Sequence, residues 1–87
     1  MPTFYFHTED GERVADTDGS DLADIEAAKD AAVQILAESL RGNSDLFWRH
    51  EGFSVIVTDD KALTLFSLNV SATMAAALGG GARRTTS

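Results

Sequence analysis

Residues 3–16, TFYFHTEDGERVAD, decide the fold. Phe4 and Phe6 fall on one face of an extended segment and Tyr5 and His7 on the other, which is typical of a β-strand rich in aromatic residues. The Asp10-Gly11 pair that follows is a strong hairpin signal, because glycine accepts the positive φ that tight hairpin turns require. We therefore predict a β-hairpin whose second strand begins at Arg13 and ends near Asp16.

The next stretch, DTDGSD at residues 16–21, resembles the start of a calcium-binding EF-hand loop. Such a loop needs a glycine at its sixth position and a bidentate glutamate at its twelfth. Those positions hold Asp21 and Ala27 instead. The stretch therefore predicts a polar turn in which Gly19 takes the unusual backbone angle and the short acidic side chains bond nearby amides.

An amphipathic helix follows the turn. Asp24 is suited to cap its N-terminus, and Gly42 is a natural stop at its other end. Between them, apolar residues recur every three or four positions, while acidic residues run down another side. The alanines in this stretch favour helix and allow close packing on a sheet.

The second half of the chain predicts a second hairpin. Residues 43–45 have loop composition, and the pattern becomes β-like from Trp48 to Thr58. After a turn at residues 59–61, Ala62 to Val70 forms the last expected strand. Val70, Met74 and Leu78 lie four apart, a spacing that allows a short helix over residues 71–78.

Two hairpins flanking one helix indicate the α+β class, a two-layer sandwich with the order β-β-α-β-β and an antiparallel sheet. We expect a single domain over residues 1–78 and a disordered tail over 79–87. The predicted core combines the inward residues of all these elements: Phe4, Phe6, Val14, Ile25, Ala28, Ala32, Leu36, Leu40, Phe53, Val55, Val57, Leu63 and Leu65.

Composition limits the function. The 87 residues carry a formal net charge of −7, with 14 acidic against 7 basic side chains, so we expect no nucleic-acid partner. The absence of cysteine excludes thiol catalysis and zinc–thiolate sites. No run of about 18 apolar residues and no signal-peptide pattern occur, so we expect no membrane partner and a cytoplasmic location.

The sequence carries no catalytic motif: it has no nucleophile elbow and no phosphate-binding loop, and we expect neither catalytic residues nor a cofactor. His7 and His50 are the only histidines, and each is expected in or near a strand. Metal binding through them stays an alternative, although their spacing matches no metal motif. Trp48 is expected to cover one edge of the core.

Several features together resemble a family of short bacterial proteins classed as a domain of unknown function. They are the opening Met1-Pro2, the Phe4-Tyr5-Phe6-His7 strand, the acidic-glycine turns, the alanine-rich helix and Val57-Thr58-Asp59. The resemblance spans about residues 1–68 and implies the same fold. Residues 49–52 look like added length, and the last hairpin lacks the family's usual glycine. No activity follows from the resemblance.

A looser similarity links the chain to small antitoxins of toxin–antitoxin pairs, and an acidic inhibitor of a basic partner would suit the charge. Our main expectation is a non-enzymatic protein-interaction module. Its partner is a protein, either another chain or a second copy in a homodimer. The expected contact residues project from the face opposite the core or cover its edge: Tyr5, His7, Trp48 and His50.

Overall fold

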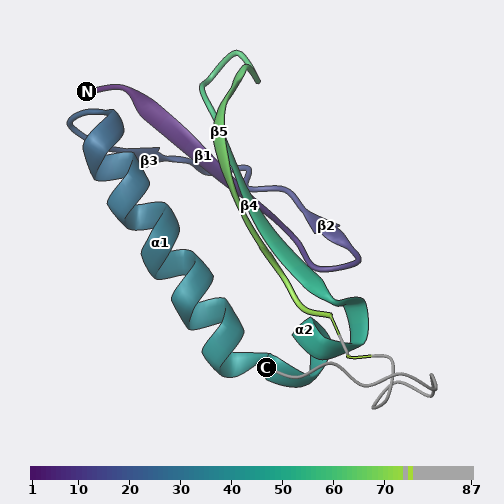
Figure 1. Cartoon of the computed structure of the whole chain (residues 1–87). Helices are drawn as coiled ribbons and strands as arrows, with labels where there is room; N and C mark the ends of the chain where they lie inside the picture. The colour runs from purple at the N-terminus through teal and green to yellow at the C-terminus, as the bar shows by residue number, and fades with distance from the viewer. Residues whose placement is uncertain (74, 76–87) are drawn as a thin grey trace.

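The computed structural model describes residues 1–73 and 75 (Figure 1). Half of the helix predicted over 71–78, and all of the tail predicted over 79–87, lie outside these residues. In the described half, Ser71 belongs to the last strand, and residues 72, 73 and 75 are not helical. The elements follow one another as β1 Thr3–Glu9, β2 Arg13–Val14, β3 Ser20–Asp21, α1 Ile25–Gly42, α2 Ser44–His50, β4 Gly52–Thr58 and β5 Thr64–Ser71.

The strands form one antiparallel sheet of five strands in the order β2-β1-β4-β5, with β3 also paired to β1. The central pair, β1 and β4, runs from Tyr5 opposite Thr58 to Glu9 opposite Ser54. Helix α1 lies along one face of this sheet (Figure 1). The predicted α+β class, the two hairpins and the antiparallel pairing are thus confirmed.

The first hairpin is confirmed, and its second strand begins at Arg13 as predicted. Glu9 pairs with Arg13, so the loop consists of residues 10–12. Only Gly11 in this loop has positive φ, at 99°. Strand β2 is two residues long, and Val14 is 60% exposed. Its predicted place in the core is therefore wrong, because the short strand carries it past the layer that α1 covers.

Helix α1 begins and ends close to where the sequence predicts. The Asp24 side chain caps it by accepting a hydrogen bond from the Ala27 N–H at 2.9 Å. Ala28 and Ala32 are fully buried, so the helix backbone approaches the sheet closely at these two positions. Ile25 is 39% exposed and does not belong to the core, because the first turn extends beyond the sheet's buried centre.

Residues 43–50 contradict the prediction of a loop followed by a strand from Trp48. They form the short helix α2, and β4 begins only at Gly52. Phe47 packs from α2 against the core, and this tertiary contact overrides the β preference of neighbouring aromatic residues. Glu51, with φ 58°, ends the helix in the left-handed conformation.

The second hairpin is confirmed, with an irregularity that changes which leucines face inward. Val57 pairs with Phe66 and Thr58 pairs with Thr64, so Leu65 is an extra residue in β5. The bulge shifts the alternation by one residue. Leu65 is 39% exposed at the bulge, and Leu63 is 63% exposed because it precedes the first residue of β5, so the predicted place of both in the core is wrong. Phe66 and Leu68 pack against the core instead.

The turn of this hairpin is held by a side chain. Asp59 Oδ1 accepts hydrogen bonds from the backbone N–H groups of Lys61 at 2.8 Å and Leu63 at 2.9 Å. Ala62 takes positive φ, at 66°, the position where a glycine would be relaxed.

The remaining core prediction holds. The buried cluster consists of Phe4, Phe6, Ala28, Ala32, Phe53, Val55 and Val57, with Leu36 and Leu40 partly buried beside it. Neither helix in the described part of the chain is long and apolar enough to cross a membrane.

Candidate functional site

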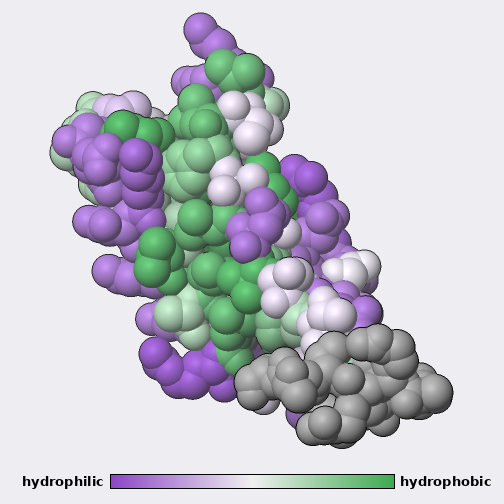
Figure 2. All heavy atoms as spheres, viewed as in Figure 1, coloured by the Kyte–Doolittle hydropathy of each residue, from purple (hydrophilic) through white to green (hydrophobic). Residues whose placement is uncertain are grey.

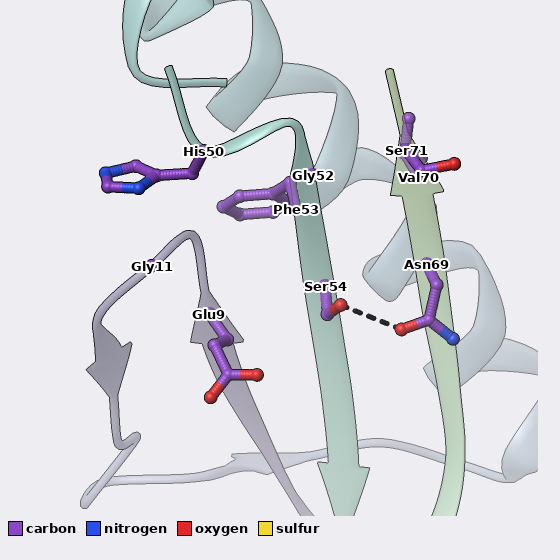
Figure 3. Close-up of a pocket in the computed structure, with 9 residues that line it drawn as sticks. All are labelled: Glu9, Gly11, His50, Gly52, Phe53, Ser54, Asn69, Val70 and Ser71. Atoms are coloured by element: carbon purple, nitrogen blue, oxygen red, sulfur yellow. Dashed lines mark hydrogen bonds between the residues drawn. The ribbon is translucent and has the colours of Figure 1, made fainter. Parts of the chain in front are cut away.

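The sheet face opposite α1 carries mostly polar side chains, and we refer to it as the open face. Strand register places His7, Ile56 and Ser67 in one row across β1, β4 and β5, and Glu9, Ser54 and Asn69 in the next. The Ser54 hydroxyl donates a hydrogen bond to Asn69 Oδ1 at 2.7 Å (Figure 3). Cross-strand polar contacts therefore order this face without covering it.

His7 is fixed on the open face by two hydrogen bonds. Its Nδ1 accepts the backbone N–H of Asp16 at 3.1 Å, and its Nε2 lies 3.0 Å from the Thr58 hydroxyl oxygen. Because Nδ1 acts as an acceptor, the proton of the neutral ring is on Nε2 and is donated to Thr58. In this tautomer His7 holds no free lone pair toward Thr58, so it does not activate that hydroxyl as a base would.

The Asp16 carboxylate is saturated by backbone donors. Its Oδ1 accepts the N–H groups of Asp18 at 3.0 Å and Gly19 at 3.2 Å, and its Oδ2 accepts the N–H of Phe6 at 3.1 Å. Partial burial acts to raise the pKa of Asp16, but these three hydrogen bonds and the nearby His7 outweigh it and hold the pKa below the ordinary value of 3.8.

This arrangement confirms a polar turn over residues 16–19, whereas the last two residues of DTDGSD, Ser20 and Asp21, form strand β3. Gly19 has φ 75°, as the turn prediction required. Within residues 1–73 and 75, no group of three or more His, Cys, Asp or Glu side chains is placed to hold a metal ion. Of its aspartates, Asp16 accepts backbone N–H groups, and Asp21 accepts a hydrogen bond from the Thr3 hydroxyl at 2.6 Å.

Tyr5 and His7 lie together, as the sequence predicted. They line a hollow of about 180 Å³ with Thr58, Asp59 and Asp60. The Tyr5 ring packs against Gly19, where an added Cβ would lie 2.9 Å from Tyr5 Cε2. Both residues are half-buried, so the turn at residues 16–19 supports this part of the open face.

His50 lines a different hollow, of about 360 Å³, together with Glu9, Ser54 and Asn69 (Figure 3). It is the last residue of α2, two residues before the first residue of β4, and so lies near a strand as expected. Its ring lies over Gly11, where an added Cβ would be 2.6 Å from His50 Cε1. The structure does not bring the two histidines into one hollow, so their geometry gives the metal alternative no support.

Trp48 also departs from its expected position. It is 53% exposed on α2 and contacts Phe47 edge to face, with ring centroids 6.0 Å apart. An indole this exposed does not cover the core edge, because α2 turns it outward. The four predicted contact residues therefore do not form a single site.

The two outer edges of the sheet differ, and the sequence reasoning missed this. Along β1, the outer edge is covered by β3 at Thr3 and Phe4, by the Asp16 carboxylate at Phe6, and by β2 at Thr8 and Glu9. Along β5, no strand of the described chain pairs with the outer edge. We refer to this outer backbone of β5 as the open edge.

The signal for the open edge is present in the sequence. Residues 64–71 read TLFSLNVS, with neither a charge nor a proline. Charged residues and prolines are the usual means by which exposed edge strands avoid pairing with other chains. Their absence from an eight-residue strand distinguishes β5 from a protected edge.

Comparison with known proteins agrees with this architecture. No curated protein and no solved structure matches the chain. A domain of unknown function, DUF6894, matches residues 3–71, which run from the first residue of β1 to the last residue of β5. The chain therefore belongs to the DUF6894 family.

Proposed function

We propose that this protein is a non-enzymatic protein-binding module that accepts an additional β-strand at the open edge of β5. The observation that carries the proposal is the contrast between the two edges of the sheet. Two short strands and a carboxylate cover the edge of β1. The edge of β5 is eight residues long, uncharged and unpaired within the described chain.

Strand addition suits this edge chemically. Unpaired backbone N–H and C=O groups in a row supply main-chain hydrogen bonds to an extended segment, and side chains on the two faces supply specificity. On the α1 side, the added strand would meet the half-buried Phe66 and Leu68. On the open face it would meet Ser67 and Asn69. The edge thus favours a strand that alternates apolar and polar residues.

The geometry of His7 supports a binding role over a catalytic one. The best-placed hydroxyl–imidazole pair, Thr58 and His7, is held in the tautomer that donates to the hydroxyl. Thr58 is also only 6% exposed, which leaves little room for a substrate to reach it.

Selection of extended peptides from a random display library against the folded chain tests this function. We expect selected peptides to lose at least tenfold in affinity with Ser67→Pro, since proline removes a backbone N–H from β5. Ser67→Ala, which keeps that N–H, should bind them like the natural chain. Peptides that bind Ser67→Pro unchanged, or that contact the Tyr5–His7 hollow instead, would contradict strand addition.

A basic partner is the second candidate, on the model of an acidic inhibitor. Asp59 and Asp60 line the same hollow as Tyr5, which places two carboxylates beside an aromatic ring. Such a group suits a lysine or arginine side chain of a partner. Binding of this kind would weaken steeply with added salt and with Asp59→Asn/Asp60→Asn, whereas strand addition would not.

A further inference from the structure

We infer that the open edge of β5 pairs with the β5 strand of a second copy, in an antiparallel dimer whose sheet runs continuously through both chains. This inference rests on the proposed function and names the occupant of the same edge. The supporting observations are the direction of the β5 backbone groups, the side-chain pairing that self-association creates, and the charge of the chain.

The backbone direction follows from the strand register. The Phe6 N–H points away from β4, toward Asp16, so the alternate residues of β1, Tyr5, His7 and Glu9, direct their backbone groups to β4. Their partners in β4 are Thr58, Ile56 and Ser54. The residues between these partners, Phe53, Val55 and Val57, therefore direct their backbone groups to β5. Their partners in β5 are Val70, Leu68 and Phe66.

The residues between those partners point outward. Ser67, Asn69 and Ser71 therefore present their N–H and C=O groups to the open edge. The Ala72 N–H bonds the Glu51 carbonyl at 3.1 Å, on the inner side, as the same alternation requires. Three alternate residues of β5 thus offer regularly spaced donors and acceptors to a new strand.

One antiparallel register uses β5 almost from end to end. In it Leu68 lies opposite Leu68 of the second copy, and Ser67 lies opposite Asn69 of the second copy. Phe66 then faces Val70 of the second copy on the α1 side. Apolar residues meet apolar residues on one face, and hydroxyl meets amide on the other, so the strand is complementary to itself under two-fold symmetry.

The α1 side of β5 leaves apolar surface for such a partner. Phe66 and Leu68 are only half-buried, as are Leu36 and Leu40 on α1, and Leu65 is 39% exposed. Figure 2 shows hydrophobic side chains gathered in a band along the boundary between α1 and the β4–β5 hairpin. A second β5 placed beside the first would cover the part of this band that β5 contributes.

Charge favours a second copy over a charged partner at this edge. The chain carries a net charge of −7, yet none of it resides on β5. A basic partner would find no carboxylate on this strand. Two identical acidic chains, in contrast, repel least where their surfaces are neutral, so the uncharged strand is where two copies approach at the lowest electrostatic cost.

The mass in solution tests the inference. Sedimentation equilibrium from micromolar to near-millimolar concentration should show the natural chain and Ser67→Ala approaching twice the chain mass of 9.3 kDa. Ser67→Pro should remain at 9.3 kDa over the same range. A natural chain that stays monomeric throughout overturns the inference, as does a dimer that Ser67→Pro leaves intact.

A cross-link tests the register and does not depend on the folding of the proline variant. Leu68 sits in a pair without direct hydrogen bonds, where opposing Cα atoms are about 4.5 Å apart, close enough for a disulfide. Because the chain has no cysteine, Leu68→Cys introduces one thiol per copy. Mild oxidation should cross-link Leu68→Cys at least tenfold faster than Ser67→Cys, whose thiols would be offset by two residues. Equal rates would overturn the register.

The two proposals fail separately. A monomeric natural chain that still binds selected peptides in a Ser67→Pro-sensitive way rejects the second copy and keeps strand addition. If the chain dimerises through β5 but binds no selected peptide, the second copy is the occupant of the open edge, and binding of other proteins there is rejected.

Discussion

Asp16 closes a gap in the sheet by accepting the Phe6 N–H at 3.1 Å with its carboxylate. On either side of this contact, β3 and β2 cover the same edge of β1. The Asp16 side chain thus bonds the one edge amide that lies between the two short strands. An unpaired edge amide would be a point where another chain can attach. No comparable cover exists along β5 within the described residues. This asymmetry leaves β5 as the strand at which another chain can pair with the sheet.

Asp16→Ala should lower the free energy of unfolding by about 2 kcal/mol, because it removes the acceptor of three backbone hydrogen bonds from a half-exposed position. Urea denaturation measures this loss. Asp18→Ala is the matched control: it removes the same charge two residues away, where the carboxylate is exposed and accepts no hydrogen bond within the described chain. We expect a change within about 0.5 kcal/mol for the control. Equal losses in the two variants would contradict the role given to Asp16.

Acid should remove the contribution that the Asp16 carboxylate makes to the free energy of unfolding. Its folded-state pKa lies below the ordinary value of 3.8, so the charged carboxylate stabilises the fold above that pH. The contribution is lost as the pH falls through the folded-state pKa. The stability difference between the natural chain and Asp16→Asn should therefore be constant near neutral pH and shrink below pH 3.8. A difference that grows on acidification would contradict this sign.

Gly19→Ala should destabilise the protein by roughly 1–3 kcal/mol, because the residue has positive φ and the new methyl group meets Tyr5 and Thr3. The added Cβ would lie 2.7 Å from Thr3 Cγ2. Gly42→Ala offers the opposite expectation: nothing lies within 4 Å of its added Cβ, at the end of α1. Thermal melts should show a lower Tm for the first variant and an unchanged or higher Tm for the second. A neutral Gly19→Ala would show that the turn does not need its backbone angle.

Ala32→Leu should destabilise the fold by about 1–3 kcal/mol, since a larger side chain has no space between α1 and the sheet. Ala32 is fully buried in the described structure. Ala37→Leu is the matched control on the exposed side of the same helix and should be nearly neutral. Chemical denaturation of both variants checks the expectation. Equal stabilities would mean that α1 does not pack closely on the sheet.

Local signals predicted much of the fold. The alternating Phe4 and Phe6, the glycine turns and the Asp24 cap act within a few residues of one another, and all three were confirmed. Helix α2 and the bulge at Leu65 were missed, because each depends on contacts between distant segments. Phe47 adopts helix to reach the core, and Leu65 leaves the alternation where β5 meets β4.

The candidate site was predicted in part for the same reason. Tyr5 and His7 share a face by strand alternation alone, and they line one hollow. The positions of His50 and Trp48 depend on the helix that the chain forms after Gly42, and the local sequence pattern did not predict that helix. The closure of the β1 edge by Asp16 joins residues ten apart through a side chain, and no periodicity reports such a contact.

Amide hydrogen exchange within β5, followed residue by residue at high and low protein concentration, tests the central claim most directly. The Leu68 N–H bonds to β4 and serves as an internal reference that should be protected at both concentrations. Our account predicts that the outward N–H groups of Ser67 and Asn69 are protected at high concentration and exchange rapidly on dilution. Rapid exchange of both outward groups at every concentration, beside a protected Leu68, would contradict pairing of the open edge with a second copy.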